Sequence, residues 1–223
     1  MTPLLQFRDL WYHYPGDRDE SRAVLRGTSA CIGVGESVGI VGRNGSGKST
    51  LLKVLANLLR PTAGEVHYHG RRVRANDQKY RSLINYCAGA PQGFYPRLTA
   101  TENLRFFSGM KGRMYTVKEC ATLLKYVGLG ESVDVKYSKF SLGMRQRMHL
   151  ACLLIEPSDI WILDEPTTGL DSEGMEMLEK LLVEMDEKAK LVVSHDAGFL
   201  QRVTTRRLVL DDGALACPDS CSS

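Results

Sequence analysis

The chain has 223 residues, of which 43% are hydrophobic and 25% charged. A chain of this length can bury about 70% of the surface of its unfolded form, so it can fold as one domain without disulfides. With 29 basic and 26 acidic side chains, the net charge of +3 is small and no basic run dominates, so nucleic acid is not expected as a partner.

The hydrophobic segments are too short to indicate a membrane span. None reaches the ~18 to 20 residues that a spanning helix needs, and the N-terminus lacks the pattern of a signal peptide. Cys31, Cys87 and Cys152 lie in apolar segments, which favours reduced thiols and a cytosolic protein. Cys217 and Cys221 follow in a polar stretch, where a weak metal site, a disulfide or an unstructured end all remain open.

The first third of the chain predicts strands around one helix. Residues 4–14 alternate apolar and polar types, residues 24–34 form a second strand region, and residues 37–41 form a short buried strand. A hairpin is expected at residues 64–73, turning at Gly70. His67 and His69 would share a strand face, but without a third ligand nearby they are interpreted as exposed histidines rather than a metal site.

A phosphate-binding loop follows the third of these strands. Gly42 to Ser49 fits G-x-x-x-x-G-K-[ST], and leucines recur at helical spacing after it until Pro61. Glycines allow the backbone N–H groups to surround an anion at a helix N-terminus, Lys48 would reach the β and γ phosphates, and the Ser49 hydroxyl would hold Mg²⁺. The candidate nucleotide-binding residues are Gly42, Arg43, Asn44, Gly45, Ser46, Gly47, Lys48, Ser49 and Thr50.

The remainder predicts a helical lobe within an α/β core. A short strand at residues 83–87 is followed by a mostly helical stretch from about 98 to 154, in which Phe106 and Phe107 would share the apolar side of a helix. Strands return at residues 160–163 and 191–193, separated by a helix at about 172–188, and a hairpin is expected at 208–215. This alternation predicts a mainly parallel sheet.

Two adjacent acids end the strand at residues 160–163. Parallel sheets place ligands at the carboxyl ends of their strands, and successive strand residues point in opposite directions, so the pair can divide its roles. Asp164 is the candidate ligand for Mg²⁺, and Glu165 is the candidate base that polarises the attacking water.

These motifs together resemble those of the ATP-binding cassette (ABC) ATPases over nearly the whole chain. As in that family, the two acids are followed by Pro166 to Asp171, the last part of which resembles the D-loop, and His195 occupies the position of the family's switch histidine. Tyr14 resembles the aromatic residue that stacks on adenine, with Tyr12 as the alternative. The resemblance implies catalytic roles for Lys48, Glu165 and His195, and a nucleotide contact for Asp171.

The stretch Phe140 to Arg147 resembles the family signature. Leu142 and Met144 stand where glycine and glutamine are more usual, but Ser141 and Gly143, which would meet the γ-phosphate of a partner's ATP, are retained. The form Ser-x-Gly-Met-x-Gln is similar to that of ABC-2-type exporter ATPases.

The Q-loop departs from the family pattern. Its glutamine is expected at Gly89 by counting forward from Tyr86, or at about Ala90 by counting back from Pro96, and Gln92 is the only glutamine nearby. Whether Gln92 serves as the metal ligand is left open.

The resemblance implies one ABC ATPase domain over residues 1–223, with a P-loop NTPase core of mainly parallel sheet, an N-terminal antiparallel β subdomain and an inserted helical subdomain. Residues 1–87 and 155–223 would form the core, and residues 88–154 the helical subdomain. The expected ligands are ATP and Mg²⁺. The expected partners are transmembrane permease subunits and a second ABC ATPase subunit, identical or not, at the cytoplasmic face of a membrane.

Two other classes of protein also contain a phosphate-binding loop of this kind. A soluble ABC ATPase acting on a ribosome or nucleic-acid complex usually carries two cassettes or a long coiled coil, and this chain has neither. An unrelated phosphate-loop kinase would need no signature and no switch histidine.

Overall fold

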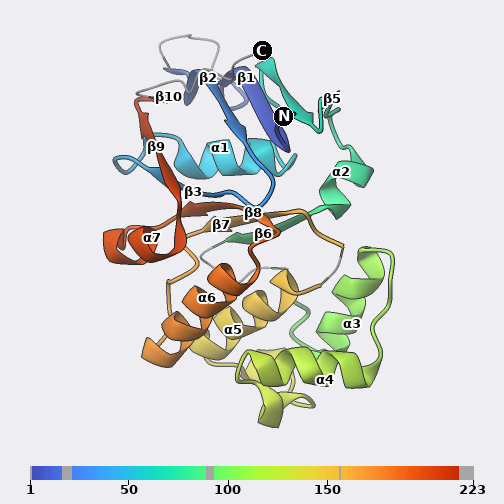
Figure 1. Ribbon diagram of the computed structural model, residues 1–223. Coiled ribbons are helices and arrows are strands. Elements are labelled where there is room, and N and C mark those ends of the chain that lie inside the picture. Colours follow the sequence, from blue (N-terminus) through green and yellow to red (C-terminus); the bar gives the residue numbers. More distant parts are fainter. Residues whose placement is uncertain (1, 17–21, 89–92, 156, 216–223) are drawn as a thin grey trace.

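The computed structural model describes residues 2–16, 22–88, 93–155 and 157–215, which contain two β-sheets (Figure 1). The smaller sheet is antiparallel and has the strand order β2-β1-β4-β5. The larger sheet has the order β10-β9-β3-β8-β7-β6, in which only the β9–β10 pair is antiparallel. The predictions of an N-terminal antiparallel sheet and a mainly parallel sheet are confirmed. The strands are β1 Leu5–Tyr12, β2 Leu25–Ile32, β3 Ser37–Val41, β4 Ala63–Tyr68, β5 Arg71–Arg72, β6 Ile84–Ala88, β7 Ile160–Asp164, β8 Ala189–Val193, β9 Arg206–Asp211 and β10 Ala214–Leu215.

Helix α1 (Lys48–Leu55) lies between the two sheets (Figure 1). Its leucines are buried in one hydrophobic cluster with the inner faces of both sheets. Alternation along β7 divides the core, because Ile160 and Ile162 join this cluster while Trp161 and Leu163 join a second one on the opposite face. The parallel sheet is therefore buried on both faces.

The second cluster lies under the helices of the opposite face, namely α3 (Ala100–Met110), α4 (Val117–Tyr126), α5 (Leu142–Leu153), α6 (Ser172–Glu184) and α7 (Ala197–Val203). Thr99 and Thr116 each begin a helix with a complete capping box, formed with Glu102 and Glu119. Two short 3₁₀ turns, η2 (Gly130–Ser132) and η3 (Tyr137–Lys139), connect α4 to α5.

Several predicted details differ from the structure. The helix expected to reach residue 188 ends at Glu184, because the chain turns so that β8 can begin at Ala189. His69 has a φ of 47° and lies in the turn after β4, so it does not share a strand face with His67. Phe106 remains 39% exposed, so it does not join the buried side of α3.

Two short helices were not predicted. Helix α2 (Gln78–Ser82) and helix α7 are too short to show a clear apolar period, but each begins at an aspartate that accepts a backbone N–H, Asp77 and Asp196 respectively. An aspartate at the N-cap position before each short stretch is the signal that could have located them.

Within residues 2–215, apart from the gaps given above, Cys31, Cys87, Cys120 and Cys152 are free thiols, as predicted for three of them. The same part of the chain contains no group of three or more metal-ligating His, Cys, Asp or Glu residues. None of its helices combines the length and hydrophobicity required to cross a lipid bilayer. Cys217 and Cys221 lie outside the described residues.

Candidate functional site

The loop between β3 and α1 fits tightly against its surroundings. A Cβ atom at Gly42 would collide with the carbonyl oxygen of Leu210, and one at Gly47 would lie 2.7 Å from the carbonyl oxygen of Val24. Gly47 also has a φ of 100°, in the left-handed region that favours glycine, and is the N-cap of α1. Glycine is therefore required at both positions by packing.

The side chain of Lys48 folds back over this loop. Lys48 Nζ donates to the carbonyl oxygens of Gly42 and Arg43, both at 2.8 Å, and the residue is only 9% exposed. The Ser46 hydroxyl is buried in the same loop. A half-enclosed ammonium group, glycine-rich backbone and a helix N-terminus together form a site suited to a polyphosphate.

The carboxylate of Asp164, at the end of β7, is held beside this loop. The Ser49 hydroxyl donates to Asp164 Oδ1 at 3.1 Å, and the Tyr86 hydroxyl lies 3.5 Å from Oδ2. Burial raises the pKa of Tyr86, and the negative charge of Asp164 raises it further, so Tyr86 stays a neutral donor. Hydroxyl and carboxylate oxygens this close together fit the ligands that Mg²⁺ prefers.

Glu165 turns away from the loop, toward the end of β8. It has a φ of 54°, and its backbone N–H donates to the carbonyl oxygen of Val193 at 2.9 Å. Its Oε1 lies 3.3 Å from His195 Nε2, and its Oε2 accepts the backbone N–H of His195 at 3.2 Å. A non-glycine residue in the left-handed region is strained, and such strain is concentrated at functional sites. The two adjacent acids thus point in different directions.

The two candidate tyrosines differ in exposure. Tyr14 is 49% exposed and its hydroxyl lies 3.3 Å from Thr50 Oγ1, beside the start of α1. Tyr12 is 5% exposed and meets the Tyr14 ring edge-on, with 5.2 Å between ring centroids. Only Tyr14 has a face available for stacking on a base.

The signature residues begin α5, which covers the other face of the larger sheet from α1. Ser141 is the N-cap of α5, and its hydroxyl accepts the backbone N–H of Met144 at 3.2 Å. Helices α1 and α5 cover opposite faces of the sheet (Figure 1), and the Ser141 hydrogen bonds remain within α5. The structure therefore does not bring Ser141 and Gly143 to residues 42–50 of the same chain.

Asp171 is the N-cap of α6. Its carboxylate accepts the backbone N–H of Gly174 at 2.8 Å and a hydrogen bond from Arg147 at 2.9 Å. The Gly174 N–H and then the Arg147 guanidinium lower the pKa of Asp171, so its carboxylate is ionised at neutral pH. Of the other candidates, Gln92 lies outside the described residues, as do Gly89 and Ala90.

Tyr86 and Arg147 were not identified from the sequence as parts of this site. Tyr86 reaches Asp164 because β6 and β7 are parallel neighbours in which Ala88 is paired with Asp164. The pairing of two strands far apart in the chain gives no local sequence signal.

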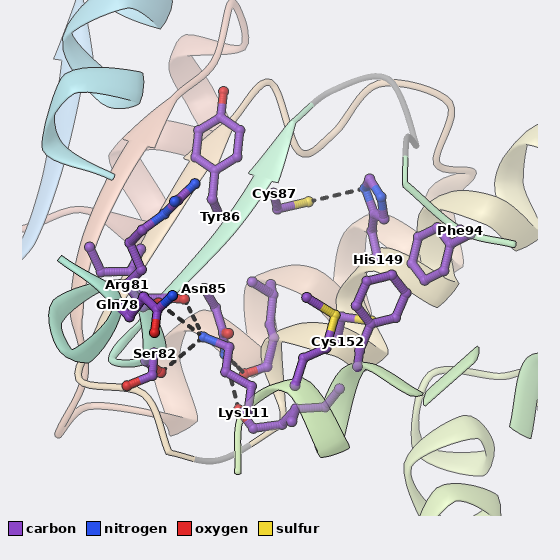
Figure 2. Close-up of a pocket in the computed structure, with 15 residues that line it drawn as sticks. Gln78, Arg81, Ser82, Asn85, Tyr86, Cys87, Phe94, Lys111, His149 and Cys152 are labelled. Carbon is purple, nitrogen blue, oxygen red and sulfur yellow. Dashed lines mark hydrogen bonds between the residues drawn. The ribbon is translucent and has the colours of Figure 1, made fainter. Parts of the chain in front are cut away.

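A groove of about 570 Å³ lies beside β6, where α2, α3 and α5 meet (Figure 2). One wall is apolar and includes Phe107 and Met110, of which Met110 is 70% exposed. The lining also includes Arg81 and Lys111, and Lys111 donates to the Ser82 carbonyl oxygen at 3.0 Å and to that of Ile84. At the inner end, Cys87 Sγ lies 3.6 Å from His149 Nδ1, and burial raises the pKa of Cys87 to about 12.

The family model described as ABC transporter matches residues 25–168. A cytochrome c biogenesis ATP-binding export protein CcmA 1 from Salmonella paratyphi A is 36% identical over 215 residues, which cover 94% of this chain and 98% of that protein. A CcmA 2 protein from Cupriavidus metallidurans is 34% identical over 189 residues, covering 85% of this chain and 88% of its own.

A solved structure has the same fold as this chain. A dimeric ATP-binding cassette in a post-hydrolysis state, bound to ADP and phosphate, superimposes with a TM-score of 0.82 at 28% identity, covering 98% of this chain and 99% of the other. The sheets, the phosphate loop and the signature helix are thus those of an ABC ATPase fold. The chain belongs to the ABC transporter family and is an ATP-binding subunit with ATPase activity.

Proposed function

We propose that this chain drives export across a membrane by closing on a second ABC ATPase subunit when ATP binds and reopening after hydrolysis. Its full-length similarity to proteins named ATP-binding export proteins supports the direction. The catalytic part of this proposal rests on the different directions of two adjacent acids: Asp164 lies toward Ser49, and Glu165 lies toward His195.

The nucleotide is bound by residues 42–50, and its base stacks on Tyr14. Lys48 gives up its hydrogen bonds to the carbonyl oxygens of Gly42 and Arg43 and contacts the phosphates. Charge-assisted hydrogen bonds to the phosphates then replace those that it makes within the loop. Ser49 and Asp164 hold Mg²⁺, with Gln92 as a further candidate ligand. The metal neutralises phosphate charge when bound.

Glu165 orients the attacking water and takes up its proton, and His195 holds the Glu165 carboxylate through its backbone N–H and ring. Replacing Glu165 with glutamine preserves the shape and removes the base. ATP turnover of Glu165→Gln should fall by about 10² to 10⁴, with ATP affinity retained. If Glu165→Gln hydrolysed ATP as fast as the wild type, Glu165 would not be the catalytic base.

The site is completed by a second subunit, because α5, which begins at Ser141 and contains Gly143, covers the face of the sheet opposite α1. They contact the γ-phosphate held by the partner, and Asp171 lies beside the same boundary. The dimeric state of the similar cassette supports this arrangement. The partner is either an identical chain or another ABC ATPase subunit.

The groove beside β6 receives a transmembrane subunit at the cytoplasmic face of the membrane. Its apolar wall and the basic Arg81 suit a short amphipathic helix that carries an acidic residue. We also propose the domain division given by the sequence, with residues 88–154 as the helical subdomain and residues 1–87 and 155–223 as the core. The groove lies at the junction of these two parts.

Affinity purification from native membranes tests the transport function. A polytopic membrane protein should copurify with the wild type and be lost from Met110→Glu, whereas Val183→Glu should retain it, because Val183 is 61% exposed on α6, outside the groove. Sedimentation with ribosomes and no membrane protein would contradict the proposal.

A further inference from the structure

Another cavity, of about 1050 Å³, is lined by a cluster of arginines. It is bounded by the end of α1, the β4–β5 hairpin and the residues that lead into α2. The arginines that line it are all exposed, and they are Arg60, Arg71, Arg72 and Arg74. The sequence indicates only a solvated strand end for the last three, and the fold adds Arg60 to them.

A buried asparagine joins the two segments that carry these arginines. Asn57 lies just after α1 with a φ of 56°, and its Nδ2 donates to the Arg74 carbonyl oxygen at 3.0 Å. The same carbonyl oxygen accepts the Asp77 backbone N–H at 3.3 Å. Asn57 is only 9% exposed, so this junction belongs to the packed part of the fold. Arg60 and Arg74 therefore reach one cavity from two segments that are tied together.

The acids of the cavity are already paired. Arg71 Nη1 lies 2.8 Å from Asp77 Oδ2, and Arg72 Nε lies 3.0 Å from Glu65 Oε2. Within the described part of the chain, the side chains of Arg60 and Arg74 make no hydrogen bond or ion pair. With four arginines and two acids in its lining, the cavity keeps two positive charges that no acid of the lining neutralises.

These two guanidinium groups suit a phosphate group. A guanidinium donates two parallel N–H groups to two phosphate oxygens, a geometry that an ammonium group cannot offer. The cavity is separate from the nucleotide site, because the phosphate loop precedes α1 and the cavity lies at the other end of this helix. The eight residues of α1 span about 12 Å. A second anion can therefore bind while the phosphate loop is occupied.

Helix α2 separates this cavity from the groove beside β6. Asp77, the N-cap of α2, lines the cavity, and the next residue, Gln78, lines the groove. Strand β5 and helices α2 and α3 lie along one side of the molecule (Figure 1). A membrane-embedded partner in the groove would bring the adjacent cavity close to the lipid headgroups around that partner.

We propose that Arg60 and Arg74 bind the phosphate of an anionic phospholipid headgroup. Arg71 and Arg72 add to the positive field of the cavity. The cytoplasmic leaflet carries anionic lipids, and their charge attracts basic side chains that come within about a Debye length. The contact holds the α2 side of the subunit against the bilayer, next to the transmembrane partner. This inference rests on the proposed function for the direction in which the cavity faces.

Flotation of the purified chain with lipid vesicles tests the contact. Saturating ADP and Mg²⁺ are included to fill the phosphate loop, so that this loop does not supply the binding. The wild type should float with vesicles that contain phosphatidylglycerol and not with vesicles of phosphatidylcholine alone. The double variant Arg60→Gln/Arg74→Gln should lower the partition coefficient about 25-fold, since each basic side chain near an anionic surface contributes a factor of about five.

Two further variants separate a phosphate site from general attraction between opposite charges. Lys118→Gln/Lys125→Gln removes the same charge from the exposed side of α4, outside the cavity, and should change the partition coefficient less than about twofold. Arg60→Lys/Arg74→Lys keeps the charge without the planar fork, and should bind the vesicles about threefold or more weakly than the wild type.

In folded proteins of similar melting temperature, three results would overturn the inference. The first is that the wild type does not float with the anionic vesicles. The second is that Arg60→Gln/Arg74→Gln floats as well as the α4 variant, and the third is that the double lysine variant floats as well as the wild type.

Soluble glycerol 1-phosphate, titrated in the presence of ADP and Mg²⁺, distinguishes a lipid from a free phosphate. Binding of this compound through Arg60 and Arg74, without flotation of the wild type, would make a free phosphate the ligand and would also overturn the inference. Failure of the proposed function appears separately, as the absence of a copurifying membrane protein, because flotation uses the purified chain without a transmembrane subunit.

Discussion

The hydroxyl of Ser49 lies 3.1 Å from Oδ1 of Asp164, although the two residues are 115 positions apart. This hydrogen bond joins the start of α1 to the end of β7 across the floor of the nucleotide site. It places a hydroxyl and a carboxylate oxygen where one Mg²⁺ could bind both. The loop and the acid strand therefore form a single site.

Removing the charge of Asp164 should separate metal-dependent from metal-independent binding. In Asp164→Asn, affinity for ATP in the presence of Mg²⁺ should fall by about tenfold or more, because a neutral amide is a weaker ligand for this hard cation. Affinity without Mg²⁺ should change much less. A titration with a fluorescent ATP analogue measures both, and Asp134→Asn in the exposed part of the helical lobe is the control. Equal losses with and without the metal would contradict the role of Asp164.

Tyr14 offers the exposed ring that Tyr12 lacks. Tyr14→Ala should raise the Kd for ATP by roughly tenfold, since stacking of a base on an aromatic ring contributes about 1–3 kcal/mol. Tyr14→Phe, which keeps the ring and loses only the hydroxyl beside Thr50, should bind almost as well as the wild type. An unchanged Kd in Tyr14→Ala would exclude the stacking role.

Two glycines of the phosphate loop should differ in their tolerance of a methyl group. Gly45 has a φ of 82° with no atom within 4 Å of a Cβ position, whereas a Cβ at Gly47 would be 2.7 Å from a backbone oxygen. Gly45→Ala should cost about 1–2 kcal/mol in the free energy of unfolding from backbone strain alone. Gly47→Ala should cost more and should also weaken ATP binding. Urea denaturation curves compare the two, and equal costs would show that the close approach at Gly47 does not matter.

Lys190 on β8 is only 2% exposed, and its Nζ donates to the Lys188 carbonyl oxygen at 3.0 Å. Burial lowers the pKa of Lys190, opposed in part by the nearby charges of Glu187 and Asp186. Because the folded state binds this proton less tightly than the unfolded state does, its charging destabilises the fold below the lowered pKa. The free energy of unfolding should therefore rise as the pH increases through the lowered pKa toward 10.5.

This dependence should be flatter in Lys190→Met than in the wild type, when unfolding is measured by urea over that pH range. The control is Lys180→Met, since Lys180 is 69% exposed on α6. A wild-type curve parallel to that of Lys190→Met would show that the buried amine does not titrate as described.

The parts of the site that the sequence predicted are those whose signals are local. Gly42 to Thr50 combines a strand, a glycine turn and a helix start within one short stretch, so its conformation follows from neighbouring residues. Asp164 and Glu165 end an apolar run, and strand alternation already assigns them opposite directions. These residues lie in the structure where the pattern indicated.

The parts that could not be predicted depend on contacts between distant segments. Tyr86 meets Asp164 only through the pairing of β6 with β7, and Arg147 meets Asp171 only because α5 and α6 pack together. The choice between Tyr12 and Tyr14 required burial, since both are aromatic residues near the end of β1. Helix α2 lacks the length at which an apolar period can be recognised.

The claim that two subunits share each ATP site is tested most directly by mixing two inactive variants of the purified chain. Glu165→Gln lacks its own base but retains the signature, whereas Gly143→Asp places a repelling charge in the signature but retains its own base. Each alone should hydrolyse ATP very slowly. In a dimer of one chain of each variant, one site is complete, so the mixture should recover up to about a quarter of wild-type activity. Full activity of Gly143→Asp alone, or no recovery although the two variants associate, would contradict a shared site.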